Sequence, residues 1–470
     1  MTYKRCFLLL ADGARHDVFA RLLQEGRLPN IQKYMVTPGG IRPAVSTFPS
    51  TTGPAYLPFL TGCHAGTCNV PGIRWFDRKK YARGGLPFRS FRSYVGFESY
   101  LLNRDLRPEI KTLFELLPRS VNIFSSINRG VPSKGNKTKN SRIWYWYYAH
   151  LTDHWSLIDK AAEKKILNVF EKEDPQFLFA VFPSIDEYSH IVDPLHPRTL
   201  QAYEGVDRAI GSIARLLEKQ GRLQETLLGI VSDHGLSKTG KHLGLNELME
   251  GMGYKTLFYP LIYKRGCVAA EMVSGNAMSH VYLKGKKGWE EPVLEEELFA
   301  SYRPLMDKLL SSPEIDIIAY RNGSGEVVAQ SRRGKGRIGF KNGSVHYRVE
   351  GGDPFGFGPL PEKMDLTEAL ERTGQTDYPD ALVALAQLFL SERTGDLVLS
   401  ASEGYDLRLH YEIHEHKGSH GSLLKEHMIT PFIFNVPLNQ KIIRTIDVFP
   451  TLLKLMGKEI PSGIDGKTLL

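Results

Sequence analysis

The sequence predicts an α/β fold built on a mostly parallel sheet, and two observations carry this prediction. Continuous apolar runs, typical of strands buried on both faces, alternate along the chain with helical patterns. The chain has 470 residues, of which 42% are hydrophobic and 24% charged, as in ordinary globular proteins. This length leaves room for one large domain and a smaller accessory unit.

Each core element can be assigned in chain order from the length and period of its apolar residues. Short apolar runs such as "CFLLLAD" and "LLGIVSDHG" indicate strands, whereas longer amphipathic stretches such as "LIDKAAEKKILNVF" indicate helices. The expected elements are a strand at 6–12, a helix at 14–25, a helix ending near 117, a strand at 121–127, a helix at 157–170, a strand at 177–186, a helix at 199–219, strands at 227–235, 395–402 and 430–437, and a helix at 445–456.

The pattern changes after about Gly253. Residues 315–352 contain short β runs joined by Asn-Gly, Ser-Gly and Lys-Gly turns, which indicate antiparallel hairpins. We therefore predict a discontinuous core of residues 1–253 plus 396–470, interrupted by a smaller inserted α+β cap subdomain over residues 254–395.

Composition limits the classes of partner and compartment. The net charge of +8 favours anionic partners, and residues 74–107 contain nine Arg or Lys against three acidic residues, interleaved with aromatic rings. This segment is either a nucleic-acid contact or a solvated basic loop, so nucleic acid is not expected as the main partner. No apolar run reaches the roughly 20 residues of a membrane span. The first strand meets Asp12 too early for a signal peptide, which predicts a cytoplasmic protein. The cysteines show no metal-ligand spacing and are expected as reduced thiols: Cys6, Cys63, Cys68 and Cys267.

Acidic residues recur where core strands are expected to end. In open parallel sheets these ends face one crevice, so carboxylates and imidazoles from several strands would gather there. Any one of them alone is an ordinary turn, cap or surface residue. Together they would repel one another or remain unsatisfied unless a divalent cation bound them, and a mixed nitrogen and oxygen ligand set suits zinc, with manganese as the alternative. The candidate ligands are Asp12, Asp186, His190, Asp233, His234 and His420.

A hydroxyl-rich stretch, "STFPSTTGPAYLPFLTG" at 46–62, precedes an apolar helical segment. A hydroxyl at a helix N-terminus lies in positive potential, and a metal would lower its pKa further, as a nucleophile requires. Ordinary N-capping by Ser or Thr is the competing explanation. Spacing alone leaves Ser50, Thr51 and Thr52 as equal candidates.

The order of these motifs resembles the alkaline phosphatase superfamily and, within it, the type I phosphodiesterase/nucleotide pyrophosphatase branch. The resemblance consists of an Asp after the first strand, the Thr-rich stretch ending in "LTG", Asp-x-x-x-His, "SDHG", a late His-Gly, and the ending "IRTIDVFPTLLKLMG…GIDGKTL". It spans residues 4–470 apart from the insertion. It implies an alkaline phosphatase-like three-layer αβα core around the parallel sheet.

The resemblance also implies the roles of the site residues. One metal ion would be bound by Asp186, His190 and His420. The other would be bound by Asp12, Asp233 and His234, with the nucleophile Thr52 between the two ions, as counted back from "LTG". The implied activity is hydrolysis of a small-molecule phosphate ester, first of all a phosphodiester or nucleotide pyrophosphate, through a covalent phospho-threonine and two divalent metal ions.

Two departures from the branch bear on substrate preference. Ala55 stands where an Asn commonly binds a phosphoryl oxygen, and "TCN" at 67–69 replaces "SHG". The Cys/Ser-x-Pro-x-Arg signature of sulfatases is absent. A phosphomonoesterase, phosphomutase or phosphotransferase on the same core is the alternative, and a non-catalytic basic nucleic-acid-binding protein is the second alternative.

Further residues near these motifs have less definite roles. The aromatic run "RIWYWYYAH" at 142–150 would either line a substrate groove or pack in the core. Arg74 and Lys238 are candidate cations for a third phosphate substituent. Three histidines are expected at the surface or outside the ligand shell: His242, His414 and His416.

Overall fold

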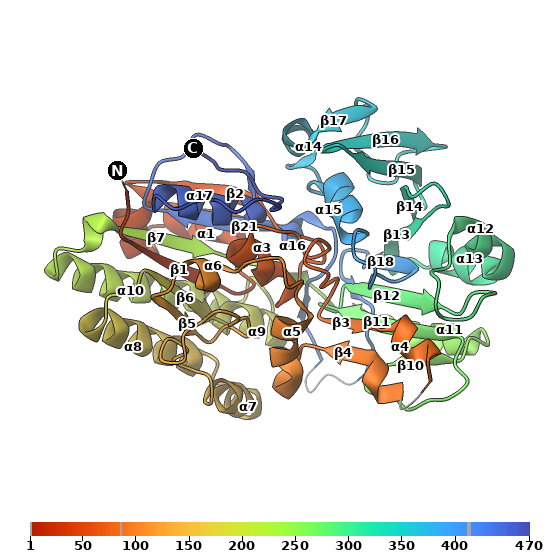
Figure 1. Ribbon diagram of the computed structural model, residues 1–470, viewed down its shortest axis with the longest axis horizontal. Coiled ribbons are helices and arrows are strands. Elements are labelled where there is room, and N and C mark those ends of the chain that lie inside the picture. The colour runs from red at the N-terminus through yellow and green to blue at the C-terminus, as the bar shows by residue number, and fades with distance from the viewer. Residues whose placement is uncertain (1, 85–86, 411–414) are drawn as a thin grey trace.

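Two large β-sheets form the framework of the computed structural model, which describes residues 2–84, 87–410 and 415–470. Figure 1 shows the first sheet with its helices on the left and the second sheet on the right. The first sheet is mostly parallel and is covered by helices, which confirms the predicted α/β fold class. Within the described residues, no helix is both long and apolar enough to cross a bilayer.

The first sheet has seven strands in the order β22-β2-β21-β7-β1-β6-β5. Its central strands β7, β1, β6 and β5 are parallel, and β21 is antiparallel to both of its neighbours. The central strand β1 is buried at every residue, as its continuous apolar sequence requires. The strand bounds, in sheet order, are Ile443–Arg444, Ile41–Val45, Ile429–Phe434, Thr226–Val231, Arg5–Ala11, Phe177–Phe182 and Ser120–Ile123.

Helices cover both faces of this sheet, which gives three layers (Figure 1). On one face, the ring of Phe7 in β1 contacts Phe170 in α8 with a centroid separation of 6.0 Å. On the other face, Phe179 in β6 contacts Phe114 in α6 at 6.4 Å. Each strand therefore contributes alternate side chains to two apolar layers. The helices named below are α1 (His16–Gln24), α3 (Leu57–Thr61), α6 (Leu113–Leu116), α7 (Arg142–Thr152), α8 (Ser156–Lys172), α9 (Ser184–Ile191), α10 (Pro197–Lys219) and α17 (Val448–Leu455).

The second sheet has nine strands, and all but one pair of neighbours are antiparallel. The hairpins predicted within residues 315–352 are present as β13 to β16. The strand bounds, in sheet order from β10 through β11, β12, β18, β13, β14, β15 and β16 to β17, are Thr256–Phe258, Ala269–Ser274, Met278–Leu283, Leu397–Ala401, Ile315–Arg321, Val327–Ser331, Gly334–Lys341, Ser344–Glu350 and Lys363–Asp365.

Strand β18 departs from the expected organisation. Its sequence, "LVLSA", resembles a core strand and lies in the segment that was assigned to the core from residue 396 onward. In the structure it pairs with β12 and β13 in the middle of the second sheet. A continuous apolar run indicates a strand that is buried on both faces, and a strand in the middle of either sheet is buried in this way. We therefore propose that the end of the insertion lies just after Ala401.

Strand β6 is shorter than expected. The apolar run was predicted to continue to Asp186, but the strand ends at Phe182 and α9 begins at Ser184. Pro183 separates the two elements, and its ring removes a backbone donor that a continuing strand would need. Asp186 consequently lies in the first turn of a helix rather than at the end of a strand.

Candidate metal centre and nucleophile

Asp12 and the Asp233-His234 pair follow the ends of the adjacent parallel strands β1 and β7. All three residues are buried. The backbone N–H of Gly13 donates to Asp233 Oδ1 at 3.4 Å, which joins the two strand ends. Gly13 has a φ of +72°, and a Cβ at this position would lie 2.7 Å from the Cα of Asp186. Only glycine therefore allows the Asp12 turn to approach α9 this closely.

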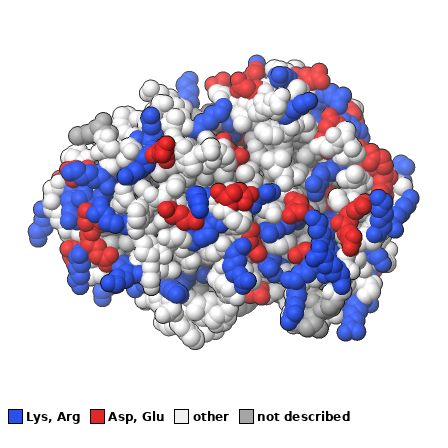
Figure 2. Space-filling view, in the orientation of Figure 1, with Lys and Arg blue, Asp and Glu red and all other residues white. Residues whose placement is uncertain are grey.

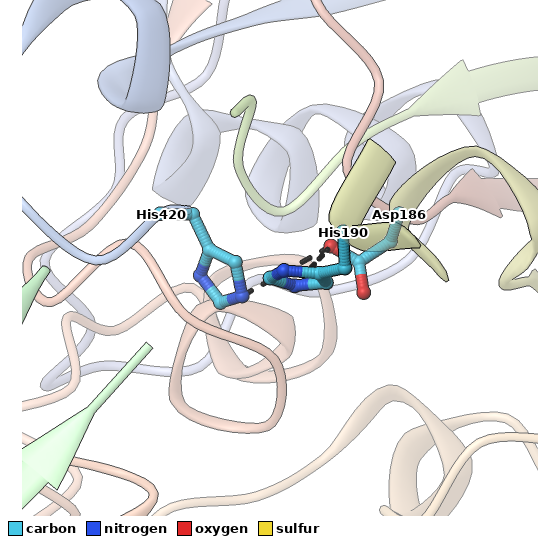
Figure 3. Close-up of side chains that lie close together, drawn as sticks. All are labelled: Asp186, His190 and His420. Carbon is cyan, nitrogen blue, oxygen red and sulfur yellow. Dashed lines mark ion pairs between the residues drawn. The ribbon is translucent and has the colours of Figure 1, made fainter. Parts of the chain in front are cut away.

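Helix α9 carries Asp186 and His190 on one face. The four-residue spacing brings the two side chains together, with His190 Nε2 3.5 Å from Asp186 Oδ1 (Figure 3). Both residues are buried. The Asp-x-x-x-His motif is thus a helical arrangement, in which spacing along the chain directly sets the distance between the ligand atoms.

His420 reaches the same place from a loop late in the chain. The preceding residues Gly418 and Ser419 form β20, which pairs with β8 (Ser237–Lys238) just after the Asp233-His234 turn. His420 Nε2 lies 3.9 Å from Asp186 Oδ1, and Figure 3 shows the ring directed toward Asp186 and His190.

Two overlapping groups of side chains place their ligand atoms within 4.8 Å of one another. The first contains Asp186, His190 and His420, and the second contains Asp12, Asp186 and His234. Asp233 lies beside the second group, with Oδ2 3.1 Å from His234 Nε2. The structure therefore brings together all six side chains singled out from the sequence, with Asp186 shared between the two groups.

The three imidazoles are oriented in the same way. In each ring Nδ1 contacts a backbone carbonyl: that of Gly418 for His190 at 2.7 Å, that of Ser50 for His420 at 2.9 Å, and that of Gly235 for His234 at 3.2 Å. A ring that donates its Nδ1–H to a carbonyl keeps the lone pair on Nε2. All three Nε2 atoms are thereby prepared to bind a metal ion.

The carboxylates lack the partners that buried charges require. Asp186 Oδ1 and Asp233 Oδ2 are buried and have no hydrogen-bond partner among the described residues. Burial and the charges of Asp233 and Asp186 raise the pKa of Asp12 well above its ordinary value, because three carboxylates so close together cannot easily all be ionised. A divalent cation would satisfy these oxygens, so the residues present fit the metal that the sequence predicts.

Thr52 is the hydroxyl that meets this cluster. Its Oγ1 lies 3.2 Å from His234 Nε2 and 3.4 Å from Asp12 Oδ1, in the turn before the 3-10 helix η2 (Pro54–Tyr56) and α3. Ser50 instead donates its hydroxyl to the carbonyl of Ser422 at 3.0 Å, and Thr51 is fully buried. Of the three hydroxyls that spacing left as equal candidates, Thr52 is therefore the one that lies beside the cluster.

Tyr56 is a site residue that sequence reasoning missed. Its buried hydroxyl donates to Asp12 Oδ2 at 2.5 Å, while Thr52 contacts Oδ1 of the same carboxylate. A tyrosine in an apolar helical segment gives no signal of such a role, because core tyrosines have the same pattern. The only clue available in the sequence was its position four residues after Thr52.

The residues at the two departures from the family pattern, Ala55 and the "TCN" segment at 67–69, lie in different parts of the structure. Ala55 lies fully buried in η2. Thr67 donates to Gln387 Oε1 at 3.4 Å, and Ser391 donates to Asn69 Oδ1 at 2.7 Å. The "TCN" segment therefore packs against the chain that leads into β18.

The two candidate cations, Lys238 and Arg74, contact residues outside the cluster. Lys238 is exposed and pairs with Asp193 at 3.6 Å. The Arg74 guanidinium lies over the ring of Tyr259, with 5.0 Å to its centroid, and donates to the carbonyl of Val273.

Of the three histidines expected outside the ligand shell, the two that the structure describes, His242 and His416, differ in their surroundings. The ring of His416 lies 4.4 Å from that of His190, next to the ligand shell. His242 contacts Asp406 at 2.9 Å. His414 lies outside the described residues.

The aromatic run at 142–150 forms helix α7, and its rings face two ways. Tyr145 and Trp146 pack around Phe124, with centroid separations of 5.2 and 5.6 Å. Trp144 and Tyr148 are exposed. Figure 2 shows that the lower edge of the molecule, where α7 lies, is largely free of charged side chains, whereas Lys and Arg gather farther right over α4 (Arg78–Ala82).

A comparison with models of protein families gave one match, to type I phosphodiesterase / nucleotide pyrophosphatase, over residues 6–423. The chain belongs to this family. As a member, it is a metal-dependent enzyme that hydrolyses phosphoric esters, as the sequence motifs predicted. No curated protein matched the chain by sequence.

Solved structures with the same fold include two kinds of protein. Human ectonucleotide pyrophosphatase / phosphodiesterase 5 is 14% identical, with a TM-score of 0.58, and the alignment covers 98% of this chain and 97% of that one. The murine protein, solved as an inactive variant with AMP, is 13% identical with the same TM-score and covers 97% and 96%. Phosphonoacetate hydrolase from Sinorhizobium meliloti 1021, solved with phosphonoacetate, is 14% identical with a TM-score of 0.58 and covers 97% and 96%. These likenesses support the fold.

Proposed function

We propose that the chain hydrolyses a small phosphate ester at a centre of two divalent metal ions, with zinc as the first candidate and manganese as the second. One ion would be bound by Asp186, His190 and His420. The other would be bound by Asp12, Asp233, His234 and Thr52. Bound there, the ions would supply Lewis-acid stabilisation of charged oxygens and would lower the pKa of the threonine hydroxyl.

Thr52 acts as the nucleophile in this proposal. Its Oγ1 loses a proton and attacks phosphorus, which forms a bond from Thr52 to phosphorus and breaks the bond from phosphorus to the ester oxygen. A water molecule then attacks the phospho-threonine from the vacated side, which restores Thr52 and releases phosphate from a monoester substrate or a phosphomonoester from a diester substrate. The buried carboxylates and Nε2 atoms are fixed before substrate arrives, so little reorganisation accompanies the reaction.

The observation that supports this proposal most strongly is the pair of buried carboxylate oxygens without hydrogen bonds, Asp186 Oδ1 and Asp233 Oδ2, among three Nε2 atoms. Such a cluster is costly without a cation and suited to one.

The test combines metal analysis with two nitrophenyl substrates, one a phosphomonoester and one a phosphodiester. We expect about two divalent ions per chain and metal-dependent release of nitrophenol from at least one of the esters. Added acceptor alcohols should not divert the phosphoryl group from water. A purified protein that binds no divalent metal and hydrolyses neither ester would contradict the proposal.

Tyr56→Phe tests the residue behind Asp12. Removing the hydroxyl leaves Asp12 Oδ2 without its 2.5 Å donor, so the carboxylate loses its fixed orientation. Partners of this kind typically contribute about 10- to 100-fold in metal affinity or activity. We expect metal affinity, measured by competition with a fluorescent chelator, to fall within that range. The control is Tyr203→Phe, whose hydroxyl accepts from the N–H of Arg15 outside the cluster and which should leave metal affinity unchanged.

A further inference from the structure

Arg142, the first residue of α7, is held in one orientation by three different partners. Its Nε donates to the carbonyl of Phe124 at 3.0 Å, and its Nη1 donates to the hydroxyl of Ser99 at 3.0 Å. The guanidinium also lies over the indole of Trp146, 4.7 Å from the ring centroid. These contacts fix the direction of the side chain but do not neutralise its charge.

No carboxylate lies within 4.0 Å of the Arg142 guanidinium among the described residues. Arg142 is partly buried, and two fully buried arginines of this chain do have such a partner: Arg78 pairs with Asp396 at 2.9 Å, and Arg444 pairs with both oxygens of Asp380. Burial lowers the pKa of Arg142, as expected for a cation without a counter-ion. A partly desolvated guanidinium of this kind is costly unless it binds an anion during function.

The Phe124 carbonyl that accepts from the guanidinium follows β5, at the same edge of the sheet as the end of β1, after which Asp12 lies. The charges of Tyr56 and Asp12 partly offset the lowering of the Arg142 pKa by burial. The segment that holds it, η4 (Gly96–Leu101), leads directly to Leu102, and a Cβ placed on Gly53 would be 3.3 Å from Leu102 Cδ1. Gly53 is the neighbour of Thr52 in the chain. Helix α7, which carries exposed aromatic rings and lies at the edge of the molecule (Figure 1), therefore has its first residue on the side of the nucleophile turn.

We propose that Arg142 is an anion-binding residue of the substrate site and that its counter-ion is a charged oxygen of the substrate phosphate. This inference rests on the proposed function and specifies its substrate class. Nη2, which has no hydrogen-bond partner among the described residues, is the donor that remains for this oxygen. A phosphomonoester carries about two negative charges near neutral pH and a phosphodiester carries one. Arg142 therefore favours dianionic esters over diesters with two organic substituents.

The experiment compares Arg142→Gln and Arg142→Lys with the wild-type protein, all loaded with metal. Gln keeps a donor for the Phe124 carbonyl but removes the charge, whereas Lys keeps the charge. For Arg142→Gln we expect kcat/KM for nitrophenyl phosphate to fall by about 10- to 100-fold, the size of a hydrogen bond to a charged group, and kcat/KM for bis(nitrophenyl) phosphate to fall only a few-fold. Arg142→Lys should keep the preference for the monoester. Arg104→Ala, which removes an exposed positive charge from the adjoining helix, is the matched control for long-range electrostatics and should change neither value.

A second measurement does not depend on turnover. Titration of inorganic phosphate into the metal-loaded Thr52→Ala protein should give a dissociation constant that rises by about 10- to 100-fold when Arg142→Gln is added. Unchanged phosphate affinity, or equal losses on the two esters, would overturn the assignment of Arg142. If Arg142→Gln does not fold, a loss of the monoester preference in Arg142→Lys overturns it and retention supports it. A wild-type protein that hydrolyses neither ester contradicts the proposed function instead, and the phosphate titration still tests Arg142.

Discussion

Thr52→Ala is expected to lower ester hydrolysis by about 10⁴-fold or more while the protein keeps nearly its full metal content. Removing the nucleophile of an enzyme that works through a covalent intermediate eliminates the reaction path, and losses of this order accompany such changes. The carboxylates and imidazoles of the cluster are untouched by the substitution, so metal binding should persist. Steady-state hydrolysis of the better nitrophenyl ester, together with metal analysis of the same sample, measures both quantities.

The control for this prediction is Thr51→Val. Thr51 is adjacent in the chain, fully buried, and without a hydrogen bond to its hydroxyl among the described residues. Valine has nearly the same shape, so the variant should fold and retain activity within a few-fold. Full activity in Thr52→Ala, or loss of activity in Thr51→Val alone, would show that the nucleophile has been misassigned.

Metal removal should have the second largest effect, on both activity and stability. We expect a chelator to abolish hydrolysis and to lower the melting temperature, because a ligand that binds only the folded state at about 1,000 times its dissociation constant contributes about 4 kcal/mol. Without the cations, the buried carboxylates at Asp12, Asp186 and Asp233 also repel one another. Readdition of Zn²⁺ or Mn²⁺ should restore both properties, and the ion that does so at the lower concentration identifies the preferred metal.

Asp186→Asn tests metal dependence by removing a proposed ligand instead of the ions. Asp186 is a proposed ligand of one ion and also lies in the second group of ligand atoms, so its loss should reduce bound metal by at least one equivalent and should prevent turnover. Asp17→Asn, at an exposed ion pair with Arg15, is a matched control that should bind metal normally. Normal metal content in Asp186→Asn would contradict the assignment of this residue as a ligand.

The parts of the fold and site that sequence predicted are those in which spacing determines geometry. Parallel strands end at one edge, so an Asp after β1 and an Asp-His pair after β7 were expected to meet, and they do. The four-residue spacing of Asp186 and His190 likewise predicts proximity, because one helical turn separates them. His420 was a candidate from the sequence as a histidine in a glycine-rich loop, but only the family resemblance assigned it to the same ion as Asp186 and His190, because its position depends on a loop.

Other features could not be predicted because they depend on contacts between distant segments. Strand β18 has the apolar composition of a core strand, and only its pairing with β12 and β13 assigns it to the second sheet. Tyr56 and Arg142 resemble ordinary residues of an apolar segment and an aromatic helix. The role of Tyr56 follows from its hydrogen bond to Asp12, and that of Arg142 follows from its having no carboxylate partner among the described residues. A local sequence pattern contains neither kind of information.

The loop that carries His420 is also attached to the second sheet, through the N–H of Ala277, which donates to the His420 carbonyl at 2.9 Å. The ligand cluster is consequently completed by a residue whose loop is held by the β11–β12 hairpin. Binding of the metal ions would therefore depend on assembly of both sheets, and it would couple the second sheet to the stability of the first.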